Sequence, residues 1–145
     1  MDQEMLSKQL DQLLQNTYIE TLAYFSVAVL ALVLFLALFE WVTRYRAWDQ
    51  IRQGNVAVAM AVGGKIFGIC NIFRFAMQNR AGSLYDSFIW AGFGFLLLLA
   101  AYFIFEFLTP VFKVDEQLEK GNQAVGLVSL AISVALSYVI GASIR

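Results

Sequence analysis

The chain has 145 residues, of which 60% are hydrophobic and 14% are charged, and its formal net charge is -1. A soluble domain is only about 45 to 50% apolar, so this composition excludes an ordinary soluble protein and indicates a membrane protein. The sequence has no histidine, the side chain that titrates near pH 7 without perturbation, and no excess of positive charge for nucleic acid. We therefore expect neither an enzyme nor a nucleic-acid-binding protein, and we expect no cofactor and no metal.

Residues 1–16 are predicted to form a short amphipathic helix. Leu6, Leu10, Leu13 and Leu14 recur at helical spacing, and charged residues occupy the other face. The start is acidic rather than basic and no small-residue cleavage site follows the next hydrophobic run, so we do not interpret it as a signal peptide. We expect this helix to lie on the membrane surface, with docking to a partner or to another protomer as the alternative.

Four long runs with almost no charge follow, each close to the roughly twenty residues that cross a hydrocarbon core of about 30 Å. We therefore predict an all-α polytopic membrane protein whose transmembrane domain covers residues 17–145. The predicted spans are residues 21–39, 55–77, 87–105 and 121–144. The polar stretches at 78–86 and 110–120 are predicted to be loops.

The stretch after the first span combines arginines with aromatic residues, which typically anchor in lipid headgroups. The predicted anchor consists of Arg44, Arg46, Trp48 and Arg52. A specific site for an anionic lipid is the alternative interpretation.

The second span carries Lys65 near its middle. Lys65 lies ten positions past Asn55, which at 1.5 Å per residue places it about 15 Å into the bilayer, near the midplane. A charge at this depth needs a partner, water or deprotonation. Glu40 and Glu106 end the first and third spans at the same membrane face, and a lysine side chain can extend several ångström toward them. They are the predicted acidic partners of Lys65.

Small residues are concentrated in the second span, and in the fourth they recur at a spacing of four. Such residues let neighbouring helices approach closely, so we expect the second span to lie inside the bundle. A hydroxyl-lined path for water or ions is the alternative reading of the serines. The predicted packing residues are Gly64, Gly68, Ser129, Ser133, Ser137 and Gly141.

The two halves of the chain resemble each other. FEWVT at 39–43 recurs as FEFLT at 105–109, and IRQGNVAVA at 51–59 recurs as LEKGNQAVG at 118–126, almost 67 residues apart. Each half is therefore predicted to be one helical hairpin, over about residues 17–80 and 83–145, with parallel rather than inverted topology. Basic residues are most frequent in the two loops that carry these motifs. We predict that these loops are cytoplasmic and that both termini are periplasmic.

Each repeated motif contains a Gly-Asn pair at the start of a span. Asn55 and Asn122 can cap the first free amides of their helices, which cannot reach water inside lipid. Alternatively, the repeat axis brings the two asparagines together with Glu40 and Glu106 as a polar ring that binds cations. With Lys65, these four residues form the candidate ion pathway.

These GN-x-A hairpins resemble the DUF350 family of small bacterial inner-membrane proteins. The matching residues are Gly54, Asn55, Ala57 and Gly64 in the first half and Gly121, Asn122 and Gly126 in the second. The resemblance covers essentially the whole chain after the amphipathic start. It implies a four-helix inner-membrane protein of unassigned activity, in a family whose members resemble parts of envelope-stress gene sets. Relative to the implied pattern, Lys65 replaces a small or apolar residue and Ser129 replaces an acidic one.

Two functions from different classes are consistent with these features. We favour a non-catalytic, homo-oligomeric assembly or anchor protein of the inner membrane with membrane-protein or envelope-stress partners, because four spans with one midplane charge make a thin pathway. The alternative is a small channel or ion-coupled transporter that uses Lys65, Glu40 and Glu106. A continuous polar pore would favour the alternative.

Overall fold

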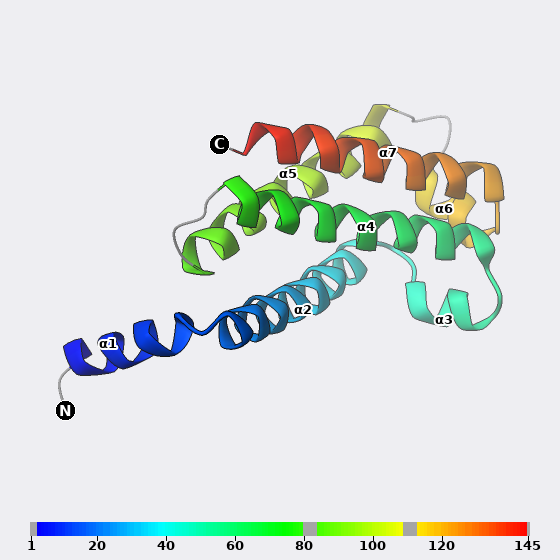
Figure 1. Ribbon diagram of the computed structural model, residues 1–145. Helices are drawn as coiled ribbons and strands as arrows, with labels where there is room; N and C mark the ends of the chain where they lie inside the picture. Colours follow the sequence, from blue (N-terminus) through cyan, green and yellow to red (C-terminus); the bar gives the residue numbers. More distant parts are fainter. Residues whose placement is uncertain (1–2, 80–83, 109–112, 145) are drawn as a thin grey trace.

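The computed structural model describes residues 3–79, 84–108 and 113–144, and within these ranges the chain forms seven helices (Figure 1). The helices are α1 (Gln3–Leu14), α2 (Thr17–Val42), α3 (Ala47–Arg52), α4 (Val56–Asn79), α5 (Leu84–Leu108), α6 (Val114–Glu119) and α7 (Gln123–Ser143). Helices α2, α4, α5 and α7 are long and apolar enough to cross a membrane. The prediction of an all-helical chain with four candidate membrane spans is therefore confirmed.

The helical bounds differ slightly from the predicted spans. Helices α2 and α5 extend three or four residues beyond the predicted span at each end, because the helical backbone continues past the uncharged run into residues suited to the membrane interface. The predicted loops at 78–86 and 110–120 are partly wrong, because α4 continues to Asn79, α5 begins at Leu84 and α6 occupies residues 114–119. Residues 80–83 and 109–112, and the terminal Arg145, lie outside the described residues.

Helix α4 occupies the middle of the bundle. It contacts α2, α5 and α7, and its largest interface is with α7, which lies beside it in Figure 1. Of the α4 span 61% is buried, compared with 17% for α2 and 33% for both α5 and α7. The small residues of α4 therefore place it inside the bundle, as the sequence predicts.

Helix α2 contacts α5 through one aromatic stripe. The Phe35 ring stacks on the Phe95 ring of α5 with centroids 4.3 Å apart. Phe39 packs edge-to-face against Phe95 at 5.2 Å and against Tyr102 at 6.0 Å. Such buried pairs contribute about 0.5 to 1.5 kcal/mol each beyond the apolar area they bury. The stripe positions the rings of Phe39 and Tyr102 at the bundle centre.

Two short helices occupy stretches that the sequence did not identify as helical. Helices α3 and α6 have six residues each, and both pack against α4. Their first residues, Ala47 and Val114, are buried in one apolar cluster with Leu118. Because an isolated helix of this length is unstable in water, this burial is what stabilises the two helices.

Each short helix is followed, two residues after its last residue, by the glycine of a Gly-Asn pair. Gly54 has a φ of 86° and Gly121 a φ of 81°, a conformation that other residues rarely adopt. In each turn the glycine N–H donates to the carbonyl three residues back, and the asparagine N–H donates to the carbonyl five residues back, which is the Schellman motif. The four bonds are Gly54–Ile51 (2.9 Å), Asn55–Gln50 (3.0 Å), Gly121–Leu118 (3.0 Å) and Asn122–Gln117 (3.0 Å).

The asparagine of each pair begins the next helix. The Oδ1 atom of Asn55 accepts from the Val58 N–H at 3.2 Å, and Asn122 Oδ1 accepts from the Val125 N–H at 3.4 Å. These bonds are the expected N-caps. Each Nδ2 atom donates to the Oε1 atom of the glutamine five residues back, at 3.0 Å in both halves. The whole set of turn and cap bonds recurs at an offset of 67 residues.

Candidate functional site

Lys65 lies on α4 and is only 3% exposed. Its Nζ atom lies 4.9 Å from the centroid of the Phe39 ring on α2 and 4.7 Å from the centroid of the Tyr102 ring on α5. The negative face of an aromatic ring attracts an ammonium ion, by about 2 kcal/mol or more when the pair is desolvated. Three helices thus contribute one residue each to a cation–π site.

A buried carboxylate lies behind Tyr102. The Tyr102 hydroxyl donates a hydrogen bond to Oδ1 of Asp115 on α6. The Arg44 backbone N–H donates to Asp115 Oδ2 at 3.3 Å. Asp115 is 4% exposed. Hydrogen-bonded groups polarise one another, so a carboxylate at the hydroxyl makes the Tyr102 ring a better partner for a cation.

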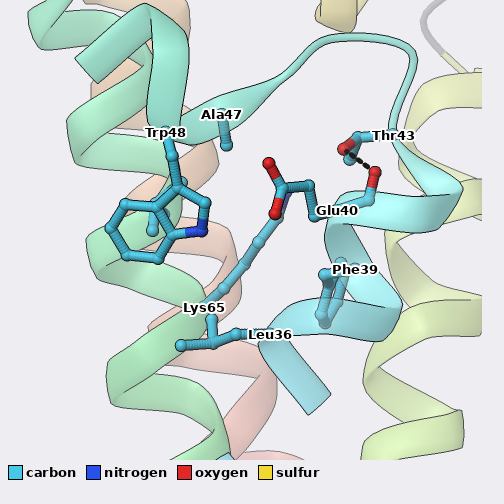
Figure 2. A pocket seen from close by; sticks show the side chains of 8 residues that line it. Leu36, Phe39, Glu40, Thr43, Ala47, Trp48 and Lys65 are labelled. Atoms are coloured by element: carbon cyan, nitrogen blue, oxygen red, sulfur yellow. Dashed lines mark hydrogen bonds between the residues drawn. The ribbon is translucent and has the colours of Figure 1, made fainter. Parts of the chain in front are cut away.

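Two small cavities meet at Lys65. The first is shown in Figure 2, where the Lys65 side chain extends from α4 toward Glu40; Thr43 and Trp48 also line it, and it offers about 20 Å³ to a water-sized guest. The second is lined by Tyr102 and by Ser129 and Ser133 of α7, and it offers about 10 Å³. One water needs about 10 to 15 Å³ on this measure, so each cavity holds about one water at most. Lys65 and Phe39 line both cavities.

Polar groups continue from the second cavity along the interface between α4 and α7. Asn71 is buried, and its Nδ2 atom donates to Ser137 Oγ at 3.0 Å. The Arg74 guanidinium donates to Asn71 Oδ1 at 3.2 Å and 3.3 Å, and to Gln78 Oε1 at 3.4 Å. This chain of bonds connects the middle of α7 to the exposed end of α4.

The predicted packing residues lie where α4 and α7 approach most closely. A Cβ atom added at Gly64 would lie 2.7 Å from the Leu130 Cα, and one at Gly68 would lie 3.3 Å from the Ser133 carbonyl oxygen. A Cβ atom at Gly141 would overlap the Phe75 ring. Ser129, Ser133 and Ser137 are buried. Gly126, which the sequence prediction did not include among the packing residues, has the same property, since its Cβ atom would lie 2.8 Å from the Ala57 Cα.

The structure brings some members of the predicted ion pathway together and separates others. Glu40 is half-buried and lines the first cavity with Lys65. Glu106 lies on α5, but its side chain is outside the described ones. Asn55 and Asn122 cap α4 and α7 and line neither of the two cavities.

The predicted headgroup anchor lies around α3. Its members are Arg44, Arg46, Trp48 and Arg52, and Arg46 lies 3.7 Å from the Asp49 carboxylate. Trp48 is 51% exposed and also lines the first cavity. Trp48 is therefore shared between the exposed surface around α3 and the cavity beside Lys65.

A family model described as "Domain of Unknown Function (DUF350)" matches residues 12–144 of the chain. The chain belongs to the DUF350 family. The resemblance inferred from the GN-x-A hairpins is therefore correct.

Two relatives of this DUF350 chain are named as membrane proteins. The UPF0719 transmembrane protein YshE of Bacillus subtilis (strain 168) is 53% identical over 130 residues, which cover 90% of this chain and 96% of the relative. The UPF0719 inner membrane protein YjfL of Escherichia coli (strain K12) is 27% identical over 105 residues, which cover 72% and 77%. No solved structure matches the chain significantly. Together with the four apolar helices, these names identify an integral membrane protein.

Three residues of the site in this DUF350 chain were absent from the sequence prediction, namely Tyr102, Asn71 and Asp115. Tyr102 had a signal, because it lies within an uncharged span rather than at a membrane interface, where tyrosine is enriched. Asn71 had one too, as an amide inside a span. Asp115 had none, since it is one of several acids in a polar stretch and only the packing of α6 decides which of them is buried.

Proposed function

We propose that this protein is a non-enzymatic, ion-coupled membrane transporter in which polar groups along α4 and α7 carry a proton or a small monovalent cation past Lys65. The observation that supports this most directly is the burial of Lys65 between two cavities, next to the Tyr102–Asp115 pair. Ionisable groups inside membrane spans are costly and mark ion pathways. A purely structural role would be met at lower cost by an apolar side chain of similar length.

The proposed path begins at the cavity of Glu40, passes Lys65 and the serines of α7, and ends at Asn71 and Arg74. Each cavity holds about one water at most, so the path is closed around Lys65 in this conformation. Transport therefore requires the Lys65 side chain to move. This requirement favours a coupled transporter over an open channel.

We also infer that the two halves are copies of one hairpin related by an axis along the membrane normal. The identical turn and cap bonds at Asn55 and Asn122 support this. Two spans per copy place both termini at one face. The basic residues near α3 and α6 favour a cytoplasmic location for these short helices and a periplasmic one for the termini.

Flux in reconstituted vesicles tests the proposed transport. We expect the wild-type protein to move protons, potassium or ammonium faster than empty liposomes do. Lys65→Met should stay folded and lower this flux by at least about tenfold, because it removes the charge that the proposed path requires at its centre. Lys120→Met, which removes an exposed lysine at the end of α6, should leave the flux unchanged. Wild-type vesicles that show no flux above empty liposomes would overturn the proposal.

A second candidate is the homo-oligomeric assembly protein predicted from the sequence. The observation in its favour is an open cleft of about 600 Å³ between the first half of α2 and the end of α4. A helix from a second copy would fill this cleft and cover its polar wall. The cleft is lined by Glu20, Thr21, Tyr24, Phe25, Ala28 and Met77. Ala28→Trp would fill part of it, and a lower oligomer mass in nanodiscs, with flux unchanged, would favour assembly there.

An anchoring role with membrane-protein or envelope-stress partners is part of this second candidate. Helix α1 supports it, because Leu6, Leu10 and Leu13 are all more than half exposed and free to contact a membrane surface or a partner. Deletion of residues 1–16 would show whether oligomers form through α1 or through the cleft between α2 and α4. Loss of oligomers on deletion would assign the docking to α1 rather than to the cleft.

A further inference from the structure

We propose that Phe39, Tyr102 and Asp115 form a binding site for a monovalent cation of the ammonium type, and that the Lys65 ammonium occupies this site as a tethered ligand. The part that this site plays in transport rests on the function proposed above. The site itself is a separate claim about binding. The chemistry of this site indicates which class of ion the proposed path accepts.

The two rings enclose the ammonium from two directions. Their planes meet at 84°, and the Lys65 Nζ atom lies over both, 4.9 Å from the Phe39 centroid and 4.7 Å from the Tyr102 centroid. Phe39 and Tyr102 are buried, so the attraction is not weakened by bulk water. The two rings attract the positive charge of the ammonium group. This attraction does not depend on the lysine side chain that carries the ammonium.

Asp115 supplies the negative charge behind the rings. The hydrogen bonds described for its two oxygens come from neutral donors, the Tyr102 hydroxyl and the Arg44 backbone N–H. Its charge, at the hydroxyl end of Tyr102, therefore remains to balance a cation that lies over the ring. Glu40, at the edge of the first cavity, provides a second carboxylate on the side from which a free cation would arrive.

The tether explains why the site is closed to free ions in this conformation. The cavities beside Lys65 offer about 20 and 10 Å³, which leaves no room for a second cation with its hydration shell. Two cations so close together in a low-dielectric interior would also repel each other strongly. A free cation can therefore enter only when the Lys65 ammonium leaves.

Chemical rescue of Lys65→Ala tests this site directly. The substitution removes three methylene groups and the ammonium, and n-propylammonium has the same four heavy atoms. We expect n-propylammonium chloride to raise the unfolding temperature of full-length Lys65→Ala in nanodiscs in a saturable way, by about 5 °C or more at saturation. 1-Propanol, which is similar in size but neutral, and sodium chloride at equal ionic strength should have no such effect.

The wild type and two variants serve as controls. Wild type, in which the site is occupied, and Lys65→Met, in which it is filled by an apolar chain, should not respond to n-propylammonium. Adding Asp115→Asn to Lys65→Ala should weaken the apparent affinity for n-propylammonium at least about tenfold, because the balancing charge is lost. An equal response to 1-propanol, or no response of Lys65→Ala to either compound, would overturn the proposal.

If Lys65→Ala folds poorly, the site can still be tested. The variant is then prepared with and without n-propylammonium throughout purification, and recovery of folded protein only with the cation supports the site. Unfolded protein in both preparations counts against it. If Lys65→Ala binds n-propylammonium in a saturable way but wild-type vesicles show no flux, the proposed transport is refuted and the proposed site stands. Flux without any rescue would refute the site alone.

Discussion

Replacement of Gly64 by alanine should loosen the contact between α4 and α7, the largest helix interface of the described chain. A Cβ atom at this position would lie 2.7 Å from the Leu130 Cα and 3.1 Å from the Leu130 carbonyl oxygen. Both are backbone atoms, so no side-chain rotation relieves the overlap. The two helices must move apart.

The size of the effect follows from the distance that has to be regained. Ordinary contact begins at 3.4 Å, so the helices must separate locally by about 0.7 Å. Overpacking of this kind costs about 1 to 3 kcal/mol, and a gap of this width forfeits a quarter to a half of the attraction between the atoms it separates. At about 3 °C per kcal/mol, we expect the unfolding temperature to fall by about 3 to 9 °C.

Gly63 provides a matched control on the same helix. A Cβ atom there would have no atom within 4 Å. Because alanine is favoured over glycine in a helix by up to about 1 kcal/mol, Gly63→Ala should leave the unfolding temperature unchanged or raise it. The measurement is thermal unfolding of both variants in the same detergent. Equal unfolding temperatures for the two would refute the reasoning from close approach.

Two further predictions concern the turns and the membrane orientation. Asn55→Ala should lower stability more than Asn122→Ala, by about 1 kcal/mol beyond a shared cap loss of similar size, because Asn55 Nδ2 also lies 2.9 Å and 3.1 Å from the carbonyl oxygens of Leu118 and Glu119. Chemical unfolding of both variants measures this, and an equal loss would contradict it. A reporter that is active only in the cytoplasm should be inactive when fused after the carboxyl terminus, and activity there would reverse the proposed orientation.

The features that the sequence predicts well are those set by local composition. Uncharged runs predict the four spans because lipid excludes charge, and small residues such as Gly64 predict the inner position of α4 because they permit close contact. The interface face of α7 follows from the spacing of Ser129, Ser133 and Ser137. Each of these properties can be predicted from the residues of a single helix.

The features that the sequence does not predict depend on contacts between distant segments. Helices α3 and α6 are too short to form alone, and they exist because Ala47 and Val114 are buried against α4. The burial of Asp115 and its bond to Tyr102 likewise require α5 and α6 to meet, which no local pattern encodes. The sequence therefore predicted only part of the candidate site. It identified Lys65 and Glu40 but not Tyr102 and Asp115.

The proposed repeat, with its offset of 67 residues, offers a reason why the Lys65 ammonium has no counterpart in the second half of the chain. The position equivalent to Lys65 is Ile132, and both residues line the second cavity. A strictly repeated sequence would place two ammonium groups beside a space of about 10 Å³, where like charges repel strongly in a low dielectric. In the proposed repeat the two turns are therefore the same, whereas a second lysine at residue 132 would introduce repulsion.

The same reasoning gives a prediction about Ile132→Lys. This change should destabilise the wild-type protein more than it destabilises the Lys65→Ile variant, where only one ammonium would occupy the cavity. We expect a coupling free energy of about 1 to 3 kcal/mol, as for charged residues that share a site. Thermal or chemical unfolding of the wild type, both single variants and the double variant measures it. Additive effects of the two substitutions would show that the two ammonium groups do not interact, and repulsion would then not explain the absence of a second lysine at residue 132.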